Sequence, residues 1–137
     1  MILVDTNVWS ELVRSAPNAR VVEWEERNAE RLWLSTVVIG EFLSGVEAMP
    51  TGKRKAALRA AYDDIVQVHA DRIAEFDLEA ALRYGPILVH QDAAGRDPGT
   101  ADTQIAATAL SRGMTLATRN TKHFAGIGLE LVDPWTA

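Results

Sequence analysis

Three carboxylates occupy positions from which acidic side chains could share a metal ion. Asp5 follows the apolar run 2–4, Glu41 lies in an apolar helical stretch, and Asp102 lies at the start of another. Carboxylates that converge raise one another's pKa, and a divalent cation relieves that repulsion. Mg²⁺ and Mn²⁺ prefer oxygen ligands, and Mg²⁺ usually combines one or two carboxylates with water and phosphate. The three acids therefore predict a hard-metal site suited to a phosphate ester.

Asp102 is the most informative of the three acids. It is in helical register with Ile105, Ala106, Ala109 and Leu110, which form an apolar stripe. The helix dipole favours an acid in the first turn, but it does not explain why that acid points inward. An inward-pointing acid indicates a functional role.

The other candidates also have simple structural explanations. Asp5 directly precedes a predicted helix and could be its N-cap. Glu41 lies at the rim of an apolar arc, where its carboxylate could extend into water. Asn120, just after the apolar run 114–118, could be a fourth ligand, but Asn is also common in turns. The combination, rather than any single residue, supports the metal site.

The elements that must position these residues predict an α/β fold with a mainly parallel sheet. Strands are expected at 2–4, 32–34, 114–118 and 129–132, and helices at 6–14, 18–28, 35–49, 53–64 and 101–112. The strand segments are continuously apolar, as in strands covered by helices on both faces. In such sheets ligands bind outside the carboxyl ends of the strands, which here are Val4, Leu34 and Thr118.

The middle of the chain gives a weaker pattern. Residues 65–69 predict a further short strand, and residues 71–90 a long helix interrupted at Gly85 and Pro86. Residues 91–99 predict a polar loop. No linker or repeat divides the chain, so residues 1–137 are expected to form a single domain.

Composition restricts the cellular setting. The chain is 47% apolar and contains no cysteine, so a disulfide framework and thiolate metal sites are excluded and a reducing, cytoplasmic location is expected. No apolar run approaches the roughly 20 residues that span a bilayer, so no membrane association is expected. The N-terminal residues lack the features of a signal peptide.

The formal net charge of −5 conflicts with nucleic-acid binding by simple phosphate neutralisation. Any contact with nucleic acid must therefore use bound cations or local basic patches. Two candidate patches are residues 53–55 with Arg59, and Arg119 with Lys122 and His123. Ordinary solvated surface is the simpler interpretation of both.

Taken together, these motifs resemble those of PIN-domain proteins. The similar segments are residues 1–7, 38–45, 102–109, 116–124 and 131–135. Each motif is weak alone, but they occur in the family's order and span nearly the whole chain. The resemblance implies a three-layer α/β/α PIN-like fold with a short central sheet.

Within that family, the sequence is most similar to toxins of the VapC or FitB type. The resemblance implies Mg²⁺- or Mn²⁺-dependent endonucleolytic cleavage of RNA, a homodimer or higher homo-oligomer, and a small antitoxin that blocks the site. It assigns Asp5, Glu41 and Asp102 as metal-binding acids. Asn120 occupies a fourth position that is acidic in many relatives. Thr6 and Thr118 would be hydroxyl partners of the site.

Two other functions remain open from the sequence. A phosphatase could use Asp5 as a covalent nucleophile, although Asn7 stands where such enzymes commonly carry a second acid. A catalytically silent module could bind RNA or protein instead. Such a module would have no need for three convergent carboxylates, so the nuclease is the favoured function.

Overall fold

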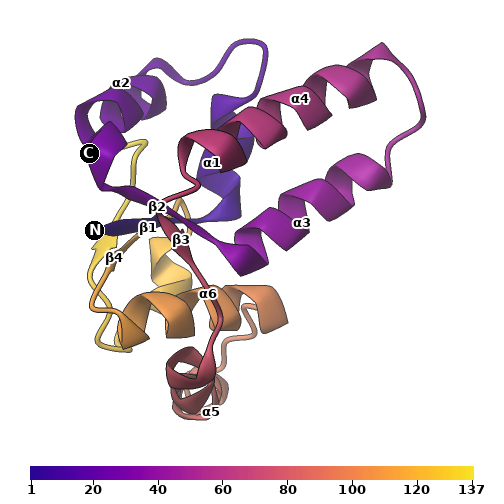
Figure 1. Cartoon of the computed structure of the whole chain (residues 1–137). Coiled ribbons are helices and arrows are strands. Elements are labelled where there is room, and N and C mark those ends of the chain that lie inside the picture. Colours follow the sequence, from indigo (N-terminus) through magenta and orange to yellow (C-terminus); the bar gives the residue numbers. More distant parts are fainter.

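A five-stranded parallel β-sheet lies at the centre of the molecule (Figure 1). The computed structural model describes residues 1–137. The strands follow the spatial order β3-β2-β1-β4-β5, so the chain moves to one side of β1 first and later to the other. They are β1 (Ile2–Val4), β2 (Leu32–Ser35), β3 (Ile73–Ala74), β4 (Thr115–Ala117) and β5 (Leu131–Val132).

Helices cover both faces of this sheet and complete the three layers expected from the sequence (Figure 1). One face carries α1 (Thr6–Leu12), α2 (Ala19–Asn28), α3 (Thr36–Glu47) and α4 (Lys53–Val68), and the other carries α5 (Leu78–Ala93) and α6 (Thr100–Ser111). Short 3₁₀ turns are η1 (Ala29–Arg31) and η2 (Thr121–Phe124). No helix combines the length and the apolar character that crossing a bilayer requires.

The core follows from the continuous apolar strands. All three residues of β1 are buried, as are Leu32, Leu34 and Leu116 in the neighbouring strands. Strands buried on both faces must be apolar at consecutive positions, which explains why alternation is absent. The rigid core therefore fixes the carboxyl ends of β1, β2 and β4.

Helix boundaries are set by the capping residues that the sequence suggested. The side chains of Asp5, Asn18 and Ser35 accept backbone N–H bonds at the starts of α1, α2 and α3. Gly113, which follows α6, has a φ of +64°, a left-handed conformation that favours glycine. These local signals place α1, α3 and α6 close to their predicted positions.

The strand predicted at residues 65–69 is wrong, because α4 continues through this segment to Val68. The His69 backbone N–H donates to the Ile65 carbonyl, so the helical pattern extends to the end of the segment. Extending an existing helix adds one hydrogen bond for each residue fixed, which outweighs the β preference of Ile65 and Val66. The actual strand on this side of the sheet is β3.

The long helix predicted from residue 71 begins only at Leu78, where Asp77 caps it. The predicted interruption at Pro86 is also wrong, since α5 continues to Ala93 and shortens the predicted loop. Proline inside a helix costs about 3 kcal/mol. Packing of Ala80 and Ile87 in the interior offsets this cost.

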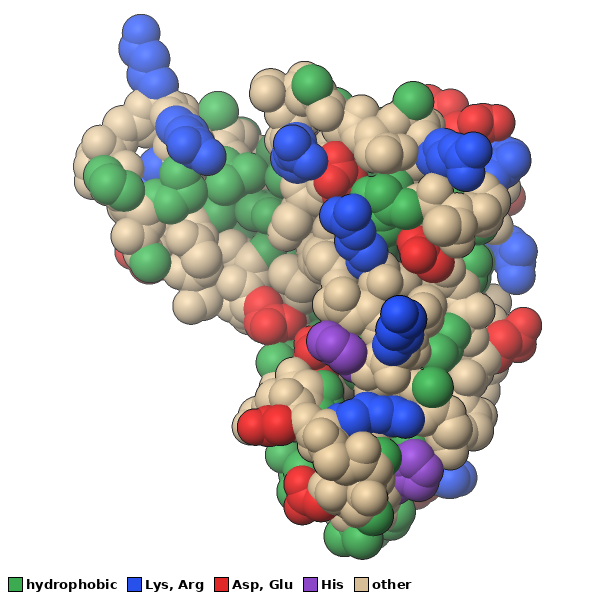
Figure 2. Space-filling view, turned by 180° about the vertical axis from the view of Figure 1, so that it is seen from behind, with side chains coloured by type: hydrophobic (Ala, Val, Ile, Leu, Met, Phe, Trp, Pro, Cys, Tyr) green, Lys and Arg blue, Asp and Glu red, His purple; other side chains and the backbone are tan.

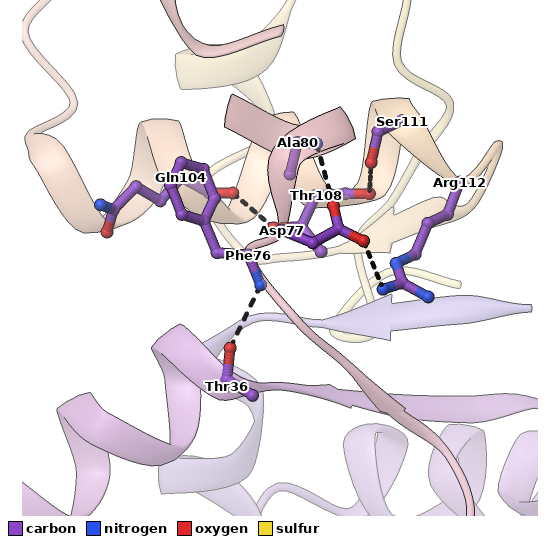
Figure 3. A network of polar contacts seen from close by, with 8 residues as sticks. All are labelled: Thr36, Phe76, Asp77, Ala80, Gln104, Thr108, Ser111 and Arg112. Atoms are coloured by element: carbon purple, nitrogen blue, oxygen red, sulfur yellow. Dashed lines mark hydrogen bonds and ion pairs between the residues drawn. The ribbon is translucent and has the colours of Figure 1, made fainter. Parts of the chain in front are cut away.

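A polar network ties the connection between β3 and α5 to both faces of the sheet (Figure 3). The Asp77 carboxylate accepts the Ala80 N–H at 3.1 Å and bonds Arg112 at 3.3 Å. On the other side, the Phe76 N–H donates to Thr36 Oγ1 at 3.3 Å. The network thereby links the start of α3 to the end of α6, the two helices that carry Glu41 and Asp102.

Candidate active site

The candidate site lies at the carboxyl edge of the sheet, beside β1. The connection after β1 leads to β2 on one side of it, and the connection after β3 returns the chain to β4 on the other side. Such a switch point opens a crevice outside the strand ends. Asp5 is the first residue after β1, and its N–H donates to Ala117 O at 2.9 Å. The sheet therefore positions Asp5 directly through its backbone.

Asp5 is buried, with 3% of its surface exposed. Its carboxylate accepts bonds from the Thr6 N–H at 2.7 Å, Thr118 Oγ1 at 2.7 Å and Asn7 Nδ2 at 3.2 Å. Burial raises the pKa of Asp5 above its usual value, although the bonds from Thr118 and Thr6 oppose this shift. Asp5 thus caps α1 and also lines the crevice, so the two explanations of this residue are compatible.

Glu41 reaches the same crevice from α3. Its carboxylate is exposed, and Oε1 accepts a 2.7 Å bond from Thr6 Oγ1. Thr6 therefore joins the two acids, since its N–H binds Asp5 and its hydroxyl binds Glu41. The position at the rim of the apolar face lets Glu41 keep its carboxylate at the edge of the crevice.

Asp102 approaches from α6 and is partly buried. Its pKa is raised to about 7, first by burial and then by the negative charges of Asp5 and Glu41. The charges of Asp5 and Glu41, from two other segments, are therefore close enough to Asp102 to affect its ionisation.

The crevice is an open pocket of about 410 Å³. It is strongly polar, and it contains arginines as well as acids. Its lining residues are Asp5, Thr6, Asn7, Ser10, Glu11, Arg14, Glu41, Asp102, Arg119 and Trp135. A pocket that combines acids with guanidinium groups suits a ligand made of a cation and an anion together.

The donor set fits a hard divalent cation. The acids of this pocket offer oxygen ligands only, and no histidine lines it. No group of three or more His, Cys, Asp or Glu side chains is arranged so that it could by itself hold a metal ion. Mg²⁺ does not need one, because it keeps several waters and takes one or two carboxylates directly. The chemistry of the pocket is thus compatible with a partly hydrated ion.

The remaining predicted site residues divide into two groups. Thr6 lines the pocket, and the buried Thr118 lies behind Asp5 and binds it. Asn120 is exposed and does not line the pocket. Its backbone N–H donates to Thr118 Oγ1 at 3.1 Å, so its link to the acids is indirect.

Sequence reasoning gave Asn7 no role at the site. The Asn7 amide donates to Asp5 Oδ2 and to Thr118 Oγ1, while its own oxygen accepts the Arg119 N–H at 3.3 Å. An amide two residues after a carboxylate, at a helix start, was the available signal. Asn7 connects the ends of β1 and β4 around the pocket.

Glu11 was also missed. It is buried in α1 and accepts bonds from Arg14 at 3.0 Å and from the Asn18 N–H at 3.0 Å. The backbone bond from Asn18 is the main reason that its pKa is lowered. The i,i+3 spacing of Glu11 and Arg14 was a visible signal for this pair, which fixes Arg14 in the pocket wall.

The two predicted basic patches differ in their position relative to the pocket. Residues 53–55 begin α4, beyond the turn that joins it to α3, and Figure 2 shows Lys and Arg side chains at the end of this projecting lobe. Elsewhere on that face, basic and acidic side chains are interspersed. In the second patch Arg119 lines the pocket, whereas the exposed Lys122 and His123 do not.

A three-layer parallel fold with acids at its switch point defines a class of α/β proteins, and comparison with known proteins specifies the family. The PIN domain model matches residues 2–128, so the chain belongs to the PIN-domain family. The resemblance inferred from the motifs is thereby confirmed.

Known relatives cover essentially the whole chain. It is 42% identical to the plasmid stability protein StbB of Pseudomonas syringae pv. tomato over the full length of both. It is 36% identical to a VapC ribonuclease of Sinorhizobium fredii over 98% of each chain. In the crystal structure of FitAcB from Neisseria gonorrhoeae, a chain of 37% identity superposes with a TM-score of 0.91 over all of both chains.

Proposed function

We propose that this protein is an endoribonuclease that cleaves RNA with Mg²⁺ or Mn²⁺ bound at Asp5, Glu41 and Asp102. The observation that carries the proposal is the convergence of these three carboxylates, from separate segments, on one pocket at the switch point. The names of relatives support the substrate class, since one is called a VapC ribonuclease and another, 28% identical, a tRNA(fMet)-specific endonuclease VapC of Shigella flexneri.

The protein's own residues would divide the work among them. Asp5, immobilised by Thr118, the Thr6 N–H and Asn7, supplies a rigid oxygen ligand. Glu41 supplies a more exposed one, oriented by Thr6. A cation bound there would generate hydroxide from water and stabilise charge on the phosphoryl group and the leaving oxygen. Asp102 can carry a proton near neutral pH while the cation is absent.

The proposal includes a protein partner. One relative, 37% identical, is called toxin FitB, and similar structures are named FitAcB and FitAB bound to a DNA fragment. We expect a small antitoxin to cover the pocket. The protein itself would act as a homodimer or higher homo-oligomer, in the cytoplasm. The net charge of −5 favours a basic partner.

The direct test is cleavage of a structured RNA by purified protein in Mg²⁺, in Mn²⁺ and in excess chelator. The variants Asp5→Asn, Glu41→Gln and Asp102→Asn should each reduce the rate by more than about 100-fold, since residues that merely support ligands are worth about 10–100-fold. Glu47→Gln, on the exposed surface of the same helix α3 as Glu41, is the matched control and should retain full activity. Undiminished cleavage in chelator would contradict metal dependence.

The alternative functions make different predictions in the same assay. A phosphatase would form a covalent phosphoaspartate at Asp5, which intact-mass measurement after acid quenching would detect. A silent binding module would retain RNA in Mg²⁺ or Mn²⁺ without cutting it.

A further inference from the structure

Arg119 and Trp135 form a pair at the pocket that has no assigned role. The Arg119 guanidinium carbon lies 4.8 Å from the centre of the Trp135 ring. Both residues line the pocket that contains the three acids. A cation above an aromatic face is attracted by the ring quadrupole, so Trp135 restrains an otherwise flexible side chain.

The Arg119 guanidinium forms no ion pair, and its charge makes only the smallest contribution to the lowered pKa of the nearby Glu11. None of the ion pairs in the chain includes Arg119, whereas Arg14, the other arginine of this pocket, binds Glu11 at 3.0 Å. The only hydrogen bond that Arg119 donates comes from its backbone, so the N–H donors of the guanidinium remain available. Arg119 is therefore the free cationic group beside the acids.

Both members of the pair are anchored to the framework of the site. The backbone N–H of Arg119 donates to Asn7 Oδ1, and the Asn7 side chain in turn donates to Asp5. The backbone N–H of Trp135 donates to Asp133 Oδ1 at 2.9 Å, just after β5. These bonds fix the backbone of both residues, and the contact with Trp135 then restrains the exposed guanidinium at one side of the pocket.

We infer that Arg119 binds a phosphate of the RNA backbone next to the metal-binding acids, and that Trp135 is a positioning residue that holds it there. The inference rests on the proposed function, because RNA must enter this pocket. A chain with net charge −5 needs a local cation for a polyanion, and the planar guanidinium matches phosphate with two parallel hydrogen bonds. The metal alone would neutralise only the phosphate that it contacts.

A binding experiment tests the contact independently of cleavage. Fluorescence anisotropy would measure the affinity of Asp5→Asn protein for a single-stranded RNA oligonucleotide at several salt concentrations. Adding Arg119→Gln should weaken binding about 10-fold and reduce the slope of log K against log salt by about 0.7, the value for one phosphate contact on a single strand. Adding Arg20→Gln, which removes an exposed arginine away from the pocket, should change neither quantity.

Trp135 variants separate positioning from a general effect on folding. Trp135→Leu should weaken RNA binding several-fold, and Trp135→Phe should restore most of it, because Phe keeps an aromatic face. Equal losses with Phe and Leu, or a melting temperature that falls in parallel with affinity, would overturn the positioning role.

Cleavage by proteins with an intact Asp5 distinguishes failure of the inference from failure of the proposed function. Arg119→Gln should raise KM about 10-fold and change kcat less than about 3-fold, the pattern of lost binding that is uniform between ground and transition states. If the wild type cleaves RNA and Arg119→Gln has the same KM and salt slope, the inference is wrong and the nuclease stands. If the wild type does not cleave in Mg²⁺ or Mn²⁺, the nuclease proposal is wrong, and Arg119-dependent binding still supports the phosphate contact.

Discussion

Thr118 Oγ1 donates a 2.7 Å hydrogen bond to Asp5 Oδ2 across 113 positions of the sequence. The bond joins the residues that follow two adjacent parallel strands, β1 and β4. It is buried, it lowers the pKa of Asp5 against the effect of burial, and it orients the carboxylate.

Replacing Thr118 by Val should therefore impair the site while leaving the fold intact. We expect a loss of about 10–100-fold in metal affinity or activity, the usual effect of removing a group that supports a ligand. Thr115→Val, in the strand that Thr118 follows and without a side-chain hydrogen bond at the site, is the matched control. Titration of Mg²⁺ against RNA cleavage measures the effect, and an unchanged titration curve would show that the bond is dispensable.

Stability without metal should fall as pH rises from 5.5 to 8. Burial and mutual repulsion raise the pKa of Asp5 and Asp102, so the folded state binds these protons more tightly than the unfolded state. The stabilisation that these two protonated acids give the folded state is present in full below the unfolded pKa of about 3.8. For Asp102 it is lost as pH rises through about 7. Melting curves in chelator at the two pH values would measure this trend.

Asp102→Asn should remove most of that pH dependence and raise the melting temperature in chelator at pH 8. Because Asp102 is partly exposed, solvent screening limits the gain to about 1 kcal/mol, which corresponds to about 3 °C for a domain of this size. Glu47→Gln serves again as the control. Mg²⁺ should raise the melting temperature of the wild type at pH 8 but not that of Asp102→Asn to the same extent. A lower melting temperature for Asp102→Asn in chelator would argue against crowding of charge.

The contribution of Glu11 to stability should have the opposite pH dependence. Its lowered pKa means that its contribution is present above the unfolded value of 4.5 and is lost as pH falls through its folded pKa. Glu11→Gln should destabilise the protein by about 1–3 kcal/mol at pH 7, because the partly buried bond from the Asn18 N–H and the Arg14 pair are weakened. Urea unfolding at pH 7 and 3.5, with exposed Glu26→Gln as the control, should show the difference shrinking at the lower pH.

The stacked rings of Phe42 and Tyr62 should hold α3 against α4. Their centroids are 4.2 Å apart and their planes differ by 4°. Tyr62→Leu should cost about 1 kcal/mol from the aromatic contact alone, while Tyr62→Phe should be close to neutral because its hydroxyl makes only a 3.4 Å contact with Ser10. Thermal denaturation distinguishes the two, and equal destabilisation would assign the effect to the hydroxyl instead.

Much of the fold could be predicted because its signals are local. The apolar strands before Asp5 and Ser35 are short and continuous, and capping side chains follow them directly. Residues 65–69 misled because β-branched side chains there lie in the last turns of a helix whose packing on α3 decides its length. Pro86 misled because tertiary contacts of α5 with α6 offset the missing hydrogen bond.

The same contrast between local signals and tertiary contacts applies to the site residues. Asp5, Glu41 and Asp102 could be found because each has a distinctive place relative to a strand end or an apolar face. Arg119 and Trp135 could not be paired from the sequence, because their contact depends on how the segment after β4 and the segment after β5 meet. The exposure of Asn120 likewise depends on the direction in which the chain turns into η2.

The central place of β1 in the sheet has a consequence for synthesis of the chain. The ribosome makes β1 before the other strands of this sheet, yet one of its two neighbours, β4, emerges only after more than a hundred further residues. The hydrogen bond from Thr118 to Asp5 can therefore form only after β4 has been made. The contact between Arg119 and Trp135 forms later still. A chain that stops before these segments lacks an assembled pocket, so the proposed cleavage of RNA can begin only after β4 and the segment that follows β5 have been translated.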